Sequence, residues 1–321
     1  SYTHQTEFFG PVLGVMRFES LQEAITIANT TGFGLTSGLQ SLDDREIVYW
    51  SNRIQAGNLY INKPTVGAIV LRQPFGGMAK SCFGPGMHAG GPNYIAQFME
   101  FRNRPAREIQ HAVSGRLSAF VAELVSCTNP PNEEEQKEIN AAIRSYEHVW
   151  QEEFSREHDH LRLLGEDNIR RYLPLPEVRV RICPGDSAVE IVNRTAAALL
   201  SGTRVTVSRS TGDESIAGMV AGCLAETGTW PLEVVTESNS EVANLILGGY
   251  RGRLRFAAPE RVPLEIREAA ARTGLWLADV PVSADGRVEL LWYLQEQSVS
   301  HAYHRYGNLG PRSGESRAEP A

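Results

Sequence analysis

Arg72-Gln73-Pro74-Phe75-Gly76-Gly77 is the centre of a glycine-rich run, residues 57–94, that decides the fold of the first third of the chain. Prolines and large apolar residues such as Ile61 and Tyr94 lie between the glycines. Glycine allows close backbone approach and positive φ, and proline stiffens the same loops. A flexible linker would be rich in glycine and serine and would lack the apolar residues. The run therefore predicts an ordered loop system.

The composition is that of an ordinary globular protein. The chain has 321 residues, 42% of them hydrophobic, and a net charge of 31 − 38 = −7. This length gives room for about two domains, and the negative charge gives no electrostatic case for nucleic acid. No apolar run approaches the ~18 residues of a membrane helix, and we expect no signal peptide. We expect no transmembrane segment and a cytoplasmic location.

The four cysteines are far apart in the sequence and form neither a CxxC pair nor a metal-ligand spacing. They are Cys82, Cys127, Cys183 and Cys223. Free thiols in a reducing compartment are the expectation. The histidines cluster only at His158 with His160 and at His301 with His304, so we expect no metal site.

Elements on both sides of the run alternate between strand and helix. Ser20 and Asp43 are suited to cap two helices, the second closed by Gly57. Residues 12–18, 35–39 and 59–61 have strand composition. This alternation favours a parallel sheet covered by helices.

The rest of the chain divides by composition. Residues 102–165 are charged and helical in pattern, which predicts a helical connector. Residues 166–295 predict a doubly wound, Rossmann-like α/β domain. Its expected strands are 178–182, 205–207, 232–235, 254–256 and 275–278, and its expected helices are 187–200, 213–227, 239–247 and 263–273. We further expect a hairpin-like turn at Asp285-Gly286, a strand over 288–294 and a frayed tail after Gly310.

The glycine-rich run and the segment Glu7-Phe8-Phe9-Gly10-Pro11-Val12 together resemble the aldehyde dehydrogenase superfamily. The resemblance is densest from Glu7 to about Phe98 and follows the family's order of motifs. It is strongest to the L-glutamate γ-semialdehyde (1-pyrroline-5-carboxylate) dehydrogenase part of bifunctional proline utilization A enzymes. It implies that residues 1–101 are the C-terminal part of a catalytic domain whose beginning is missing. It also implies NAD as cofactor, with FAD only in an upstream proline dehydrogenase domain.

The resemblance assigns roles residue by residue. The nucleophilic cysteine and the base glutamate are expected upstream, so no catalytic residue is expected in this chain; Cys82 stands where the family usually has glycine. Glu7 matches the carboxylate that binds the nicotinamide ribose hydroxyls, and Phe9 matches the aromatic beside the nicotinamide. For the substrate, matches are found at Gly67, Ala68, Phe75 and Ser81. There, backbone N–H groups would hold a carboxylate while an aromatic ring covers the aliphatic stem.

The second α/β unit resembles the family's cofactor-binding half without its working residues. Asp186 replaces an oxyanion asparagine, Ser208-Arg209-Ser210 replaces a lysine-proline pair, and Pro259 lies in the turn near the pyrophosphate. We therefore expect residues 166–295 to be non-catalytic and 296–321 to be a docking motif and tail. Docking would be onto the protein's own upstream domains or within a homo-oligomer. Two alternatives stay open: a dehydrogenase for another aldehyde, and a structural or docking module without chemistry.

Overall fold

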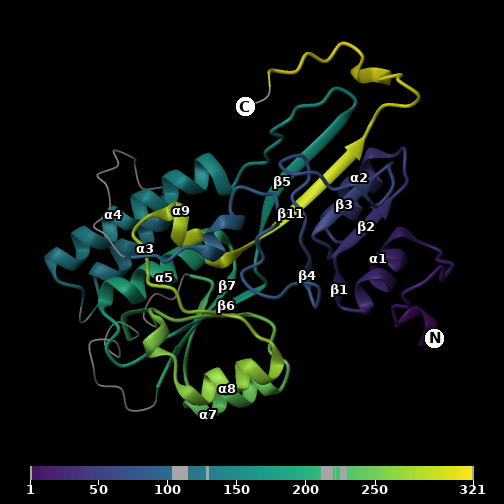
Figure 1. The fold of residues 1–321 in the computed structure, drawn as a ribbon. Helices are drawn as coiled ribbons and strands as arrows, with labels where there is room; N and C mark the ends of the chain where they lie inside the picture. The colour runs from purple at the N-terminus through teal and green to yellow at the C-terminus, as the bar shows by residue number, and fades with distance from the viewer. Residues whose placement is uncertain are drawn as a thin grey trace.

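A computed structural model describes residues 2–102, 115–127, 130–210, 220, 222–224 and 230–319. The described chain forms a small four-stranded sheet, a five-stranded parallel sheet and a group of helices beside the latter (Figure 1). Two long strands, β5 (Glu166–Pro174) and β11 (Leu294–Ala302), run from the five-stranded unit to the N-terminal third of the chain (Figure 1). The fold is thus α/β, with its N-terminal and C-terminal parts joined through one sheet.

The N-terminal third contains two capped helices and short strands. The Ser20 side chain caps α1 (Leu21–Thr30), and the Asp43 side chain caps α2 (Asp44–Ser51), as predicted. The strands are β1 (Phe33–Gly34), β2 (Thr36–Leu39), β3 (Asn58–Ile61) and β4 (Met78–Ala79). β2 and β3 are parallel, as the alternation indicated, and β1 pairs with β4 in antiparallel fashion. A small core that includes Ile25, Trp50 and Leu59 holds the helices on this sheet.

Two local predictions for this third are wrong. Residues 12–18 form no strand, because no described strand lies beside them and extended backbone needs a partner for its hydrogen bonds. Their apolar side chains are exposed, up to 86% for Leu13. Helix α2 ends at Ser51, with Asn52 as its C-cap, well before Gly57.

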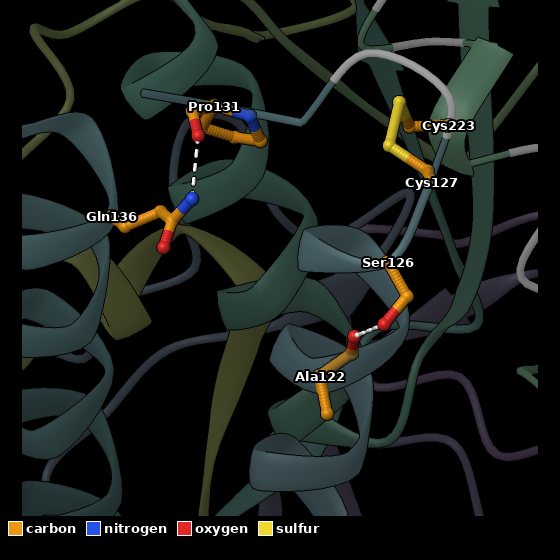
Figure 2. The surroundings of a disulfide bond; sticks show 6 residues. All are labelled: Ala122, Ser126, Cys127, Pro131, Gln136 and Cys223. Carbon is orange, nitrogen blue, oxygen red and sulfur yellow. Dashed lines mark hydrogen bonds between the residues drawn. A yellow bond between two sulfur atoms is a disulfide. The ribbon is translucent and has the colours of Figure 1, made fainter. Parts of the chain in front are cut away.

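The helical connector contains α3 (Gly115–Val125) and α4 (Glu133–Val149), followed by a π-helical turn over Trp150–Phe154. Asn132 and Glu135 form a capping box at the start of α4. Just after α3, Cys127 is disulfide-bonded to Cys223, with 5.4 Å between their Cα atoms (Figure 2). The expectation of four free thiols is therefore wrong for this pair: the fold joins positions that are 96 residues apart in sequence.

The five-stranded sheet confirms the predicted doubly wound pattern. Its strand order is β10-β9-β6-β7-β8, all parallel, with α5 on one face and the pair α7 and α8 on the other (Figure 1). Gly202 ends α5 in the left-handed conformation. The bounds are β6 (Glu177–Arg181), α5 (Ala188–Ser201), β7 (Arg204–Arg209), β8 (Leu232–Thr236), α7 (Asn239–Leu247), β9 (Arg253–Arg255), α8 (Leu264–Thr273) and β10 (Leu277–Ala278). The helix expected over 213–227 falls largely outside the described residues.

Strand β11 (Leu294–Ala302) joins the two parts of the molecule. It is parallel to β3 on one side and antiparallel to β5 (Glu166–Pro174) on the other, which gives the sheet order β2-β3-β11-β5. The strand predicted over 288–294 is wrong, because α9 (Gly286–Glu289) and a 3-10 turn over Leu290–Tyr293 occupy it. The expected hairpin at Asp285-Gly286 is also wrong, since Asp285 caps α9. The apolar side chains of the 3-10 turn are buried in the core.

The segment after β11 is held down by ion pairs. Arg312 pairs with Asp167 at 2.8 Å, and its guanidinium lies 3.6 Å from the Tyr303 ring centroid. Arg317 pairs with Asp159 at 3.3 Å and also with Asp167. The prediction of a frayed tail after Gly310 is therefore wrong up to the last described residues.

Candidate functional site

The loop that carries Gly67 and Ala68 is exposed and contains a glycine with positive φ. Gly67 has φ +88°, and a side chain built on it would meet nothing within 4 Å. Among the described residues, neither the Gly67 nor the Ala68 backbone N–H donates to a protein acceptor. Unused N–H groups at an exposed glycine can form an anion-binding concavity. The loop can therefore present donors to an anionic group.

Phe75 lies beyond the turn that ends this loop. Its backbone pairs with Ala89 through two hydrogen bonds of 2.9 Å, and its ring side is 37% exposed. A turn closed by the bond from Gln73 N to Ile69 O, 2.7 Å, separates it from Gly67. The backbone of Phe75 is thus fixed by hydrogen bonds, and its side chain is partly exposed.

The glycines next to Phe75 are required by close packing. A Cβ on Gly77 would lie 2.2 Å from the Ser81 carbonyl oxygen, and one on Gly57 would lie 1.9 Å from the Gly76 carbonyl oxygen. The Ser81 hydroxyl accepts a hydrogen bond from the Gly34 N–H at 3.1 Å. Ser81 is therefore placed as a support of the loop system.

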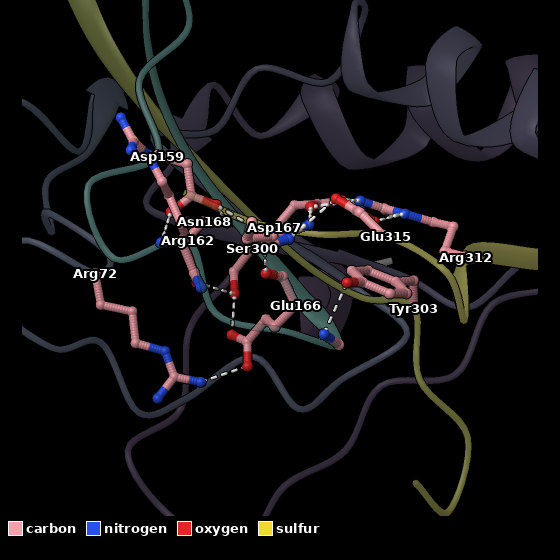
Figure 3. A network of polar contacts seen from close by, with 12 residues as sticks. Arg72, Asp159, Arg162, Glu166, Asp167, Asn168, Ser300, Tyr303, Arg312 and Glu315 are labelled. Atoms are coloured by element: carbon pink, nitrogen blue, oxygen red, sulfur yellow. Dashed lines mark hydrogen bonds and ion pairs between the residues drawn. The ribbon is translucent and has the colours of Figure 1, made fainter. Parts of the chain in front are cut away.

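Glu166, at the start of β5, ties the loop to the C-terminal part of the chain. Its carboxylate accepts from Lys63 and from Arg72, which comes directly after the exposed loop, and from Ser300 of β11 at 2.9 Å (Figure 3). Burial raises the pKa of Glu166, but the bonds from Lys63, Ser300 and Arg72 outweigh it and lower the pKa overall. The carboxylate is thus charged at neutral pH and holds both ends of the loop.

β11 supports the same loop system from beneath. The Ser298 hydroxyl donates to the Pro74 carbonyl oxygen at 2.5 Å, directly before Phe75. The buried Glu296 carboxylate accepts from the His88 backbone N–H at 3.0 Å and from the Asn93 side chain at 2.6 Å. Ser298 and Glu296 thus link the C-terminal strand β11 to the glycine-rich run, residues 57–94.

Burial controls the protonation of this support. It lowers the pKa of His88 to about 4, against the raising effect of the hydrogen bond to the Pro74 carbonyl oxygen, 3.1 Å away. It raises the pKa of the Glu296 carboxyl, against the lowering effect of the bonds from Asn93 and His88. His88 is therefore neutral at pH 7, and burial in the folded state favours this neutral form.

Glu7 and Phe9 lie apart from this loop. Both are exposed, and Phe9 is 98% exposed. Contacts described near them stay within the N-terminal segment, such as the edge-to-face pair of Tyr2 with Phe8. The described chain therefore does not bring the two predicted cofactor residues together with Gly67, Ala68 or Phe75.

The carboxyl edge of the five-stranded sheet, where nucleotides bind in many doubly wound folds, is filled by the protein's own charges. Asp186 precedes α5, is buried, and pairs with Arg194 at 2.6 Å and Arg261 at 2.8 Å. Arg261 also pairs with Glu190, which closes the capping box of α5. The helix N-terminus that could bind a phosphate is therefore already next to two carboxylates.

A second buried pair lies at the neighbouring strand end. Arg255, the last residue of β9, pairs with Glu289 at 2.9 Å, and both side chains are 0% exposed. Tyr293 donates to the same carboxylate at 2.7 Å. The residues at this edge do not fit a dinucleotide, since acidic groups occupy the position of its phosphates.

No described helix is long and apolar enough to cross a membrane. Within the described residues, no three His, Cys, Asp or Glu side chains gather in a way that could hold a metal ion.

Sequence reasoning predicted the exposed loop and missed its supports. Glu166 is 103 residues from Lys63 and 94 from Arg72, and Glu296 is 203 residues from Asn93. Nothing local in the sequence indicates such pairings. The acidic Glu296 within an otherwise strand-forming segment was the one available signal.

Comparison with known proteins finds a family match in the first third of the chain. Residues 1–104 match the sequence profile of the aldehyde dehydrogenase family. The bifunctional protein PutA of Rhizobium meliloti is 46% identical over 97 residues, 30% of this chain and 8% of that protein. The 1-pyrroline-5-carboxylate dehydrogenase of Staphylococcus haemolyticus is 38% identical over 96 residues, 30% of this chain and 18% of that enzyme.

A solved structure extends the similarity to most of the chain. Proline utilization A from Corynebacterium freiburgense is 34% identical, with a TM-score of 0.69, over 96% of this chain and 27% of that one. The chain therefore spans less than a third of each of these three relatives.

Proposed function

We propose that this chain is the C-terminal part of an NAD-dependent L-glutamate γ-semialdehyde dehydrogenase, because residues 1–104 match the aldehyde dehydrogenase family. The intact protein would oxidise the semialdehyde to L-glutamate, as the second step of a bifunctional proline-degrading enzyme. Relatives named PutA and 1-pyrroline-5-carboxylate dehydrogenase support this substrate.

One observation carries the proposal: the exposed loop with unused N–H groups at Gly67 and Ala68, followed by the partly exposed Phe75. Backbone donors suit the α-carboxylate of the semialdehyde, and an aromatic ring suits its aliphatic stem. Glu166 and Ser298 hold this loop in place, so its donors need little ordering when substrate binds.

NAD fits the exposed N-terminal segment rather than the five-stranded sheet. Glu7 offers a carboxylate that can accept from two ribose hydroxyls, and Phe9 offers a free aromatic face. NAD would supply the hydride acceptor. The nucleophile and base lie outside this chain in the proposal, since burial raises the pKa of the Cys82 thiol and disfavours its thiolate.

The C-terminal part acts in this proposal as a non-catalytic support. Exposed apolar residues of the N-terminal segment, such as Leu13 and Val15, would pack on the remainder of the catalytic domain. Residues 296–321 would dock there or within a homo-oligomer. FAD would be bound only by an upstream proline dehydrogenase domain. A cytoplasmic location belongs to the same proposal.

Replacing Phe75 tests the substrate assignment. In the intact protein, Phe75→Ala is expected to raise KM for the semialdehyde by roughly 5- to 160-fold, because an apolar contact of ~1–3 kcal/mol is lost. KM for NAD should stay within about twofold. Phe83→Ala is the matched control, since Phe83 is 80% exposed and outside the loop. Equal KM for the semialdehyde in wild type and Phe75→Ala would remove Phe75 from the site.

A further inference from the structure

A cleft of about 410 Å³ lies between the glycine-rich loops of the N-terminal third and the five-stranded sheet. One wall comes from β4 and the loop with Cys82. The other comes from residues directly before β6, β9 and β10. Since these strands are parallel, that wall is the amino edge of the sheet. The cleft is therefore distinct from the carboxyl edge with its ion pairs of Asp186 and Arg255.

Arg253, the first residue of β9, lines this cleft as a buried cation. It is 8% exposed, donates to the carbonyl oxygens of Trp292 at 3.3 Å and Pro85 at 3.2 Å, and lies 4.6 Å from the Trp276 ring centroid. Among the described residues, no carboxylate lies within ion-pair distance of it. Burial lowers the pKa of Arg253 to about 10, so it stays charged at neutral pH.

A buried charge without a counter-charge is unfavourable, and most of the other buried arginines in the described chain pair with a carboxylate. Arg170 pairs with Glu153, whereas the buried Arg181 donates to neutral oxygens of Ser208, Glu237 and Asn239. Arg194 and Arg255 each pair with a buried carboxylate. Arg253 instead meets a cavity. Two carbonyl oxygens and the Trp276 ring are its described partners, and an anion in the cavity would add the missing counter-charge.

The other polar residues that line the cleft would also favour an anionic ligand. Arg251 adds a second cation, which is exposed and makes no hydrogen bond or ion pair with any described residue. Gln55 and Gln295 add amides, and no aspartate or glutamate is among the residues that line the cleft. The volume lies in the range of small-molecule sites, and guanidinium groups bind carboxylates and phosphates in a bidentate manner.

We propose that this cleft binds a small organic anion whose carboxylate or phosphate group pairs with Arg253 and Arg251. The site is separate from aldehyde oxidation, and it does not depend on the proposed function. Its ligand would bridge the N-terminal third and the C-terminal unit, because both walls come from different parts of the chain.

Cys82 gives a built-in reporter for the test. It lines the cleft and is partly exposed, whereas the other free thiol described, Cys183, is buried. The rate at which iodoacetamide alkylates Cys82 in the intact protein is measured by mass spectrometry. Citrate and adenosine monophosphate are the anionic probes, one for each chemistry, and adenosine is the uncharged comparison. We expect at least one anion to slow alkylation about fivefold or more, and adenosine to leave it unchanged.

Variants decide whether the arginines are responsible. Arg251→Gln should weaken protection by the anion at least tenfold in concentration, as the loss of a charge-assisted pair predicts. Arg253→Met should abolish it, and Arg305→Gln, an exposed arginine outside the cleft, should retain it. If Arg253→Met fails to fold, Arg251→Gln still decides. Protection by neither anion, equal protection by adenosine, or full protection in Arg251→Gln would overturn the proposal.

Discussion

At the scale of single residues, the exposed loop of Gly67 and Ala68 depends on the protonation states of the groups that support it. Glu166 must be ionised to hold Lys63 and Arg72, and His88 must be neutral to stay buried behind the loop. The sequence allowed Gly67, Ala68, Phe75 and Ser81 to be predicted as loop residues, because glycine and proline act locally. It could not show Glu166 or Glu296, since their partners are about 100 to 200 residues away.

The burial of His88 predicts a pH dependence of stability. Its pKa falls from 6.5 to about 4 on folding, so the unfolded state binds more protons between these values. The stability contribution is therefore complete above pH 6.5 and is lost as the pH falls toward 4, by up to ~3 kcal/mol. The raised pKa of Glu296 acts in the opposite direction and reduces the net slope.

Urea unfolding of the intact protein from pH 7.5 to 4.5 is the measurement. His88→Asn, which keeps a donor for the Pro74 carbonyl, should flatten the acid side of the curve, whereas His304→Asn, at an exposed position, should not. A wild-type slope that survives in His88→Asn would assign the acid sensitivity to other groups.

At the scale of elements, β11 is the strand that connects the two parts of the fold. It lies between β3 and β5 and carries Glu296, Ser298 and Ser300 toward the loop system. Helix caps at Ser20 and Asp43 were predictable, because a cap is decided by a few neighbouring residues. The pairing of β11 was not, because strand register depends on partners distant in sequence. Residues 288–294 have the composition of a strand, yet nearly all of them form helical turns whose apolar side chains are buried in the core.

Deletion variants separate β11 from the tail. Removing 296–321 from the intact protein is expected to abolish dehydrogenase activity and to cause aggregation, since β3 and β5 then have unpaired edges. Removing 311–321 deletes the ion pairs of Arg312 and Arg317, which are partly exposed and contribute about 0–1 kcal/mol each. Activity should persist in that shorter variant, with a small drop in Tm. Unchanged activity, Tm and solution mass after the longer deletion would show that β11 is not needed for activity, stability or assembly.

At the scale of the whole molecule, the two edges of the five-stranded sheet differ in what they face. Its carboxyl edge is closed by Asp186, Arg194 and Arg261, while its amino edge faces the N-terminal third across the cleft of Arg253. From the sequence, Asp186 was predicted to be unsuited to the role of the family's asparagine, and the structure shows that its carboxylate is engaged in ion pairs. The position of the cleft was not predictable, because it arises only where the two parts meet.

The most direct measurement of the central claim compares two aldehydes with the intact protein and NAD. L-glutamate γ-semialdehyde and pentanal share a five-carbon chain, but only the semialdehyde has the α-carboxylate that the Gly67–Ala68 loop would bind. We predict NADH formation with kcat/KM for the semialdehyde on the order of 100-fold or more above that for pentanal, and no NADH formation by residues 1–321 alone. Equal efficiency with both aldehydes, or no oxidation of the semialdehyde by the intact protein, would contradict the account.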